Sequence, residues 1–441
     1  MSMSLQLPIL PLATPQQRYS CHGCGSCCRD FSVQLRPVDL QRLEAQQWRT
    51  ELGFDPVVKF RGQEYLRQRE DGACVFLAQD GKCRIHARHG FAEKPLACQM
   101  FPYTLSPGAH ATRLGVSFAC GSVIANRGDL VRGQETEALR IALRGIPESL
   151  AAAPDALLAQ GMRSQAGEVE SLERRLVQWM DRAQPLRMRI DGIGWMAQTL
   201  AAAKLAAVRG ARWKELLDIL FGALQEELAM SALQPPTKRQ RAMLRGAVFA
   251  RTEDPKPLAA RAPSRVRATA HQFLRSVQWQ FGRPRAIVPT IGIGWPCGAT
   301  FGAVDAMPSA AGSDDADAID ELVTRWLRAR LEGGRVWGSG AYGWSAVEGL
   351  AALALAVASV GWVARWHAAA SGRSNVMVAD MQAAVGRIDR TAGRAPWLGG
   401  AAERWRIAYL LRDNGMQRIL RAQWSIEQSS NITSATHTRS A

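Results

Sequence analysis

Eight of the chain's nine cysteines lie in its first 120 residues, and four of these fall within one run, Cys21-x-x-Cys24-x-x-Cys27-Cys28. Thiolates at two-residue spacings are the ligand pattern of a soft metal ion or an iron–sulfur cluster. Gly23 and Gly25 allow the backbone of the run to wrap closely around such a group. Because a bound metal replaces part of a hydrophobic core, the pattern predicts a small, irregular, metal-stabilised domain here.

The other cysteines of this region complete the set of candidate ligands, and two kinds of metal centre compete for them. Structural zinc usually takes two separated pairs, and only the first pair is clear here. The Cys21/Cys24/Cys27 triple is closer to part of a ferredoxin run with a remote fourth ligand, although the following Cys-Pro is absent. An iron–sulfur cluster of the 4Fe-4S type is therefore preferred to zinc, with one site or two left open. The predicted metal ligands are Cys21, Cys24, Cys27, Cys28, Cys74, Cys83, Cys98 and Cys120.

Some of these cysteines are not expected to act together, and some nearby side chains could replace or add to them as ligands. Side chains of adjacent residues tend to diverge, so Cys27 and Cys28 are not expected to serve one cluster together. The remaining cysteine, Cys297, is expected to be a packed thiol. Four histidines lie among the cysteines and could replace a thiolate, but solvated or hydrogen-bonded side chains are expected for His22, His86, His89 and His110.

The chain start lacks a basic segment, a sustained apolar core and a small-residue cleavage site, so it does not read as a signal peptide. Without export, clustered cysteines are better explained as metal ligands than as a disulfide framework, and a cytoplasmic location is predicted. The uncharged apolar segment Gly349–Ala364 is shorter than the roughly 20 residues of a membrane span. A buried helix, and no membrane span, is expected there.

The fold class predicted for the whole chain is mainly α, with the small cysteine-cluster domain followed by a larger helical region. Apolar residues recur at helical spacing in several segments, as in Val169, Leu172, Leu176 and Trp179. Pro37 is predicted to begin a helix inside the cysteine region. The predicted order is an irregular leader (1–19), the cysteine-cluster domain (20–130), a helical region (131–235), a basic Pro/Gly-rich connector (236–311), a second helical region (312–428) and a disordered tail (429–441).

Most of the formal net charge of +16 comes from one segment. Residues 238–285 hold two Lys and ten Arg against Glu253 and Asp254, a net charge of +10. Phe273, Trp279 and Phe281 lie among these arginines, a combination that can also bind nucleic acid. A solvated connector is the first interpretation. The functional alternative is a cationic surface for a protein substrate or another acidic partner, with nucleic acid less well supported.

One further motif, Gly338-Ser-Gly-Ala-Tyr-Gly343, fits the G-x-G-x-x-G pattern of dinucleotide sites. Such a site also needs a preceding strand and an acidic residue about 20 positions later. Neither is present, so a glycine-rich turn between helices is predicted.

The residues that flank the cysteines resemble the CxxCxxCC cysteine-cluster family, also called YkgJ-type. The shared motifs are Cys21-x-x-Cys24-Gly-x-Cys27-Cys28-Arg, Cys74-Val-Phe-Leu, Asp80-Gly-x-Cys83-x-Ile-His, Lys94-Pro-x-x-Cys98-x-x-Phe-Pro and Cys120-Gly. The resemblance covers about residues 20–121, and Lys94 stands where the family usually has arginine. It implies zinc or iron chelation, or iron–sulfur binding, and leaves the reaction undefined. More distantly, the chain resembles the flagellin lysine N-methylase, which implies methyl transfer from S-adenosylmethionine to protein lysines.

These observations favour a metal-binding cysteine-cluster protein that holds an iron–sulfur cluster and has a redox or protein-modifying role. The alternatives are an S-adenosylmethionine-dependent lysine methylase of the flagellin type and a non-catalytic zinc-binding interaction protein. Whether the chain is an enzyme stays open. If it is one, it is expected to be a protein-lysine N-methyltransferase or an iron–sulfur oxidoreductase.

Overall fold

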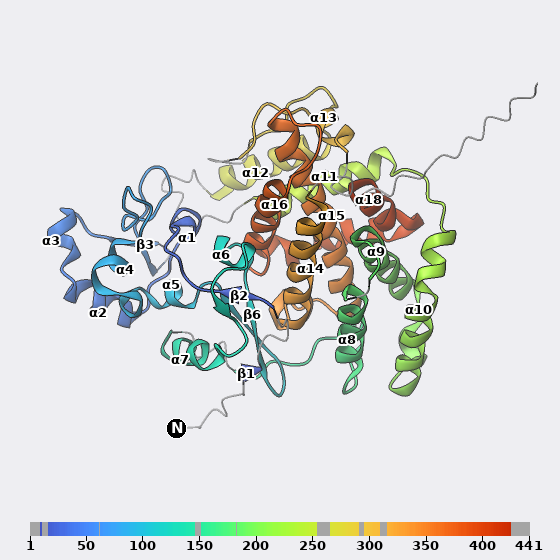
Figure 1. Ribbon diagram of the computed structural model, residues 1–441, viewed down its shortest axis with the longest axis horizontal. Helices are drawn as coiled ribbons and strands as arrows, with labels where there is room; N and C mark the ends of the chain where they lie inside the picture. The colour runs from blue at the N-terminus through green and yellow to red at the C-terminus, as the bar shows by residue number, and fades with distance from the viewer. Residues whose placement is uncertain are drawn as a thin grey trace, which may run out of the picture.

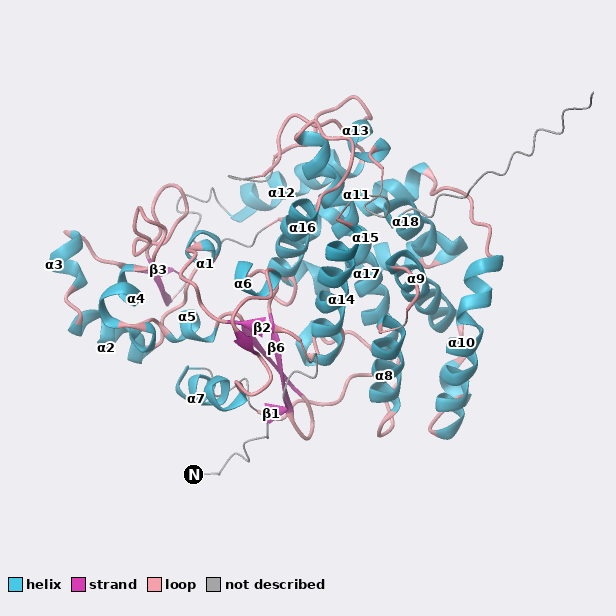
Figure 2. Ribbon diagram, viewed as in Figure 1, coloured by secondary structure: helices cyan, strands magenta, loops and turns pink. Residues whose placement is uncertain are grey.

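The computed structural model of the protein describes residues 9–10, 16–60, 62–145, 151–181, 183–253, 265–290, 295–308 and 315–424. The cysteine region lies at one side of the molecule, in blue, and a larger body of helices occupies the other side (Figure 1). Helices dominate, and the few short strands lie mainly between the two parts (Figure 2). The predicted mainly α class is confirmed. The predicted tail 429–441 lies outside the described residues.

The N-terminal part is built from short elements joined by turns. They are β1 (Ile9–Leu10), β2 (Arg18–Tyr19), α1 (Ser26–Asp30), α2 (Pro37–Ala45), α3 (Trp48–Leu52), β3 (Val57–Phe60), β4 (Gln63–Leu66), α4 (Arg84–His89), α5 (Leu96–Met100), β5 (Tyr103–Pro107), β6 (Thr112–Val116), α6 (Gly121–Ile124), β7 (Asp129–Leu130) and α7 (Glu135–Gly145). Strand β1 pairs in parallel with β6, and β2 pairs antiparallel with β7. The described part of the predicted irregular leader is therefore held by two short sheets.

Helix α2 begins at Pro37, as predicted, and its first turn fixes the segment that carries Cys98. The Asp39 carboxylate is buried and accepts hydrogen bonds from the backbone N–H groups of Arg36 (3.0 Å) and Leu96 (2.9 Å). The first bond caps α2, and the second positions α5 beside it. The helix stops at Ala45, so Trp48 belongs to the following helix α3.

The helical part follows in sequence. Its helices are α8 (Glu168–Met180), α9 (Leu186–Ala202), α10 (Ala211–Met230), α11 (Lys238–Thr252), α12 (Arg265–Gln280), α13 (Phe301–Ala306), α14 (Ala316–Glu332), α15 (Ala346–Ala370), α16 (Val378–Thr391), α17 (Ala401–Leu410) and α18 (Gly415–Trp424). The stretch 236–311, interpreted from sequence as a connector, carries α11, α12 and α13. Within the second predicted helical region, α17 and α18 are separate helices, since Asp413 and Asn414 between them have positive φ angles of 50° and 56°.

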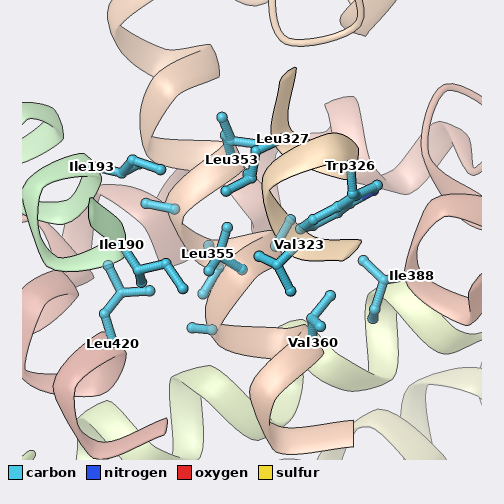
Figure 3. Packing of buried hydrophobic residues seen from close by; sticks show 14 of the residues in the cluster. Ile190, Ile193, Val323, Trp326, Leu327, Leu353, Leu355, Val360, Ile388 and Leu420 are labelled. Carbon is cyan, nitrogen blue, oxygen red and sulfur yellow. The ribbon is translucent and has the colours of Figure 1, made fainter. Parts of the chain in front are cut away.

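Helix α15 runs through the centre of the helical body. In length and composition it could cross a membrane, but 89% of its most apolar window is buried inside the fold. The segment Gly349–Ala364 is therefore a buried helix, as predicted. Figure 3 shows its side chains Leu353, Leu355 and Val360 among those of α9, α14, α16 and α18, represented by Ile190, Ile193, Val323, Trp326, Leu327, Ile388 and Leu420.

Two of the three hydrophobic cores of the described residues contain cysteines. The large core of the helical body also includes residues of the N-terminal part, such as Tyr19, Phe118 and Cys120. A small separate core, with Trp48, Phe76 and Cys74 among its buried members, lies farther out in the N-terminal part. Cysteines thus belong to both cores, and the region between them is the junction of the molecule.

Asp389 of α16 ties the N-terminal part to the helical body. Its carboxylate is fully buried and accepts hydrogen bonds from Ser117 Oγ (2.9 Å), the Phe118 backbone N–H (2.7 Å) and Trp326 Nε1 (3.1 Å). Arg335 Nη1 pairs with it at 3.1 Å. Burial alone would raise the pKa of Asp389, but Arg335, Arg330 and these hydrogen bonds hold the pKa below its usual range.

We expect Asp389→Asn to lower the free energy of unfolding by about 3 kcal/mol, because it leaves the buried Arg335 charge uncompensated. Since the folded pKa of Asp389 is depressed, its contribution is complete above the unfolded-state pKa of about 4 and disappears as pH falls through the folded-state value. Urea unfolding between neutral and acidic pH measures both effects. Asp413→Asn, at an exposed position of similar chemistry, is the control. Equal loss in the two variants would contradict this role.

Candidate metal centre

The cysteine run folds against the turn at Asp80–Gly81. Gly25 has a φ of 70°, and a Cβ there would lie 2.3 Å from the Gly81 carbonyl oxygen, so only glycine fits this close approach. Helix α1 starts at the next residue and places Cys27 and Cys28 in its first turn. The Cys74 backbone N–H donates to the Cys28 carbonyl (2.7 Å), which joins the run to the second cysteine segment.

Three later cysteines stand at or in short helices. Cys83 precedes α4, Cys98 lies in α5 and Cys120 precedes α6. Backbone N–H groups of Ile85 and His86 donate to the Cys83 sulfur, and those of Ser122 and Val123 donate to the Cys120 sulfur. Such donors favour the thiolate form that binds metals. Short helices therefore orient sulfurs that are far apart in the sequence.

A small cavity of about 40 Å³ is enclosed by seven of the eight predicted ligands. Tyr19, His22, His86 and Lys94 also line it. The seven cysteines are Cys21, Cys24, Cys27, Cys28, Cys83, Cys98 and Cys120. The eighth, Cys74, is buried in the small outer core and does not line this cavity. The structure thus brings together the cysteines of four separate sequence segments.

The thiol of Cys28 hydrogen-bonds to those of Cys27 and Cys83. These bonds lower the pKa of Cys27 and of Cys83 and raise the pKa of Cys28. Burial raises the pKa of Cys98 well above its ordinary value and that of Cys74 to about 12. A lowered pKa favours the thiolate form, which is the form that binds a cation.

Lys94 is the basic residue of the site and was noted from sequence only as a departure from the family pattern. Its side chain is 4% exposed and lies 5.2 Å from the centre of the Phe91 ring. Burial alone would lower the pKa of Lys94, but Cys98, Cys21, Cys83 and Cys27 together raise it. A buried ammonium group among thiolates offsets part of the negative charge that gathers there.

The donor set fits a thiophilic metal, since sulfur and imidazole ligands suit zinc and iron–sulfur clusters. Within the described ranges, no three Cys, His, Asp or Glu side chains already stand in a metal-holding arrangement. A bound ion would replace the hydrogen bonds that Cys28 makes to Cys27 and Cys83. To bind the ion, some of these cysteine side chains would have to rotate, but their sulfurs already face one cavity.

One sequence expectation for an individual cysteine is wrong. Cys297 is exposed rather than packed and lines neither this cavity nor the larger one beside it. Cys27 and Cys28 both line the small cavity and hydrogen-bond to each other, but the expectation that they do not serve one cluster together stays a prediction.

Two of the four histidines face the cysteine cavity, namely His22 and His86. His89 instead packs edge-on against Trp48, with ring centres 5.6 Å apart, and His110 lines a separate cavity. Only the first two are therefore placed to replace a thiolate ligand.

A larger cavity of about 520 Å³ shares a wall with the small one. Cys27, Cys28, Cys83 and Cys98 line both cavities. Sequence reasoning missed the residues that the helical body contributes to the larger cavity, among them Arg335, Asp389 and Arg394. The only sequence pattern near them is the Gly338–Gly343 motif. It forms the predicted turn between α14 and α15, and Ser339 and Gly340 line the cavity.

Comparison with known proteins agrees with this geometry. Residues 20–121 match the CxxCxxCC family, described as "Putative zinc- or iron-chelating domain", which confirms the resemblance seen in the sequence. An uncharacterised protein of Methanocaldococcus jannaschii is 32% identical over 88 residues, which are 20% of this chain and 29% of that protein. The chain thus spans under a third of this relative's length. No solved structure matches the chain.

Thiol alkylation tests the grouping of the cysteines. In metal-free protein, iodoacetamide should modify the exposed Cys21, Cys24 and Cys297 faster than the buried Cys74 and the half-buried Cys98, whose pKa burial raises well above its ordinary value. Bound metal should protect Cys21 and Cys24, because ligated thiolates are poor nucleophiles, while Cys297 serves as the internal control. Mass spectrometry of peptides measures each rate. Unchanged labelling of Cys21 and Cys24 after metal loading would remove them from the ligand set.

Proposed function

We propose, from the CxxCxxCC domain of residues 20–121, that this protein binds an iron–sulfur cluster through its clustered cysteines. The observation that carries the proposal is the single cavity lined by seven cysteines from four sequence segments. Cys21, Cys24 and Cys27 supply the closely spaced part of the ligand set. Cys28, Cys83, Cys98 and Cys120 are the candidates for the remaining position. A 4Fe-4S cluster held there would give the protein a one-electron redox centre.

The redox or protein-modifying role is supported by the position of the sulfurs. Four of them also line the larger cavity, so a molecule bound there would lie next to the cluster. Lys94, buried at the same place, would offset the negative charge of the cluster's thiolates. A purely structural zinc site needs neither an adjoining cavity nor an excess of sulfurs over four.

Protein purified without oxygen should contain iron and acid-labile sulfide, with a brown colour that dithionite bleaches. Cys24→Ser should abolish the colour and destabilise residues 20–121, because metal binding supplies part of their folding free energy. Visible absorption and elemental analysis are the measurements, and Cys297→Ser is the matched control. Stoichiometric zinc without sulfide would overturn the choice of cluster and favour the zinc alternative.

A second candidate is an S-adenosylmethionine-dependent protein lysine methylase. It is supported by the Gly338–Gly343 turn, because Ser339 and Gly340 of this turn line the cavity beside the cysteines. The charge of the cavity argues the other way, since S-adenosylmethionine carries a net positive charge and most charged residues of the lining are basic. The methylase therefore ranks below the redox metalloprotein.

Calorimetry with S-adenosylmethionine on cluster-loaded and metal-free protein decides between these two candidates. We expect no binding to either form. Binding to the loaded form alone would place the cofactor at the cysteines, and binding to both forms would place it in the helical body. Either result would make the methylase the preferred function.

The partner and the cytoplasmic location stay predictions. Arg245 and Arg251 of α11 are buried and paired with Asp305 and Glu403. These charges of the basic segment stabilise the helical body instead of forming a surface. We propose the partner site at the residues that follow α12, where Phe281 and Arg283 are both exposed.

A further inference from the structure

Another large cavity, of about 550 Å³, lies in the helical body between α9, α10 and α18. In Figure 1 these helices lie on the other side of the molecule from the cysteine region. Among the described residues, none lines both this cavity and a cavity beside the cysteines. Its volume is that of a small-molecule site. It is therefore a separate candidate site, which the proposed metal function does not use.

One buried ion pair holds the walls of this cavity together. The Arg421 side chain of α18 donates from Nε to the Asp191 carboxylate of α9 over 2.7 Å. Its outer nitrogens donate to the backbone carbonyls of Leu228 in α10 and Ser231 in the loop that follows. Gln417 donates a further hydrogen bond to Asp191 over 3.0 Å. The charges of Arg421 and Asp191 are thus satisfied within the fold.

Two more arginines line the cavity, and both lack a partner. Arg187 lies four residues before Asp191 on α9, and Arg418 lies three residues before Arg421 on α18, so each is one helical turn from the ion pair. Both side chains are half-buried, and neither makes a hydrogen bond or an ion pair with a described residue. Since Asp191 is the one acid of the lining and already pairs with Arg421, two positive charges remain uncompensated.

The surroundings of these two guanidinium groups favour an anion. The Nε atoms of Arg187 and Arg418 are buried without an acceptor, so the protein removes part of the water from each charge. The outer nitrogens are not buried in this way, and they are the part of each group that a ligand in the cavity can reach. Partly desolvated charges interact more strongly than solvated ones. A guanidinium group binds phosphate or carboxylate through two parallel N–H bonds.

The rest of the lining is largely apolar. It includes Met188, Leu228, Ala229, Leu233, Pro235, Pro236 and Ala422. Burial of an organic body against these side chains would add to the binding free energy that the charges supply. The cavity therefore suits an organic anion better than a bare inorganic ion.

We infer that this cavity binds a small organic dianion, a phosphate monoester or a dicarboxylate, whose two negative charges match those of Arg187 and Arg418. The Arg421–Asp191 pair shapes the site and does not contact the ligand's charge. The inference goes beyond the proposed function, because neither the cysteines nor a metal takes part in the binding.

Two ligands with the same aromatic body test the inference on the full-length protein. Naphthyl phosphate is a dianion at about pH 8, because the second pKa of a phosphate monoester is about 6, and naphthol lacks the phosphate. Calorimetry at about 0.15 M salt, which screens exposed charges, should show one bound phosphate per chain. Its affinity should be at least about tenfold above that of naphthol, as expected for one charge-assisted hydrogen bond. Naphthalene dicarboxylate, titrated in parallel, shows which of the two acidic groups the site prefers.

Matched variants test the two unpaired arginines. Arg187→Gln and Arg418→Gln should each weaken the dianion by about tenfold and leave naphthol unchanged. Arg412→Gln removes the same charge at an exposed position outside the cavity and should change neither affinity.

Circular dichroism checks that the variants are folded, and if one of them is not, the other variant and the preference of the unmodified protein still decide. Equal affinity of the dianions and naphthol would overturn the inference. So would an unchanged preference in folded Arg187→Gln and Arg418→Gln, or an equal loss in Arg412→Gln.

Discussion

The contact of cysteine sulfurs at the junction of two hydrophobic cores is the constraint on which the rest of the structure depends. Cys120 belongs to the large core and Cys74 to the small one, while Cys28 and Cys83 pack against the small core from the cavity side. A metal held by sulfurs from these segments would link the two cores through strong ligand bonds. The short helices and turns of the N-terminal part then need little hydrophobic burial of their own.

The same junction brings the candidate metal ligands next to the larger cavity. Because Cys27, Cys28, Cys83 and Cys98 line both the small and the large cavity, a metal held by these sulfurs would lie next to any molecule in the large cavity. Asp389 and Arg335 hold the helical wall against β6 and its following turn by buried hydrogen bonds. The buried contacts that stabilise the fold and the candidate metal ligands therefore lie in one small region.

Local patterns in the sequence predicted a large part of this architecture. The start of α2 at Pro37, the buried apolar helix α15 and the turn at Gly338–Gly343 each depend on nearby residues, and each was predicted correctly. The cysteine motifs predicted the match of residues 20–121 to the CxxCxxCC family model, because their spacing is local too. The grouping of seven cysteines at one cavity depends on the tertiary fold, and the spacing of cysteines along the sequence does not predict it.

What the sequence did not predict depends on pairs of residues that are distant along the chain. Arg245 and Arg251 looked like solvated charge, but their partners Asp305 and Glu403 lie in other helices. Likewise, Arg335, Asp389 and Arg394 carry no motif, and only the packing of α14 and α16 against the N-terminal part brings them to the cavity. Buried ion pairs of this kind leave no periodic pattern in a sequence.

Hydrogen–deuterium exchange with and without bound metal tests most directly the claim that the cysteine centre joins the two cores. Removing the metal should speed amide exchange together in four segments, 21–28, 74–86, 96–100 and 120–124, while α9 and α15 of the helical body remain protected. A change confined to residues 21–28, or no change at all, would contradict the account.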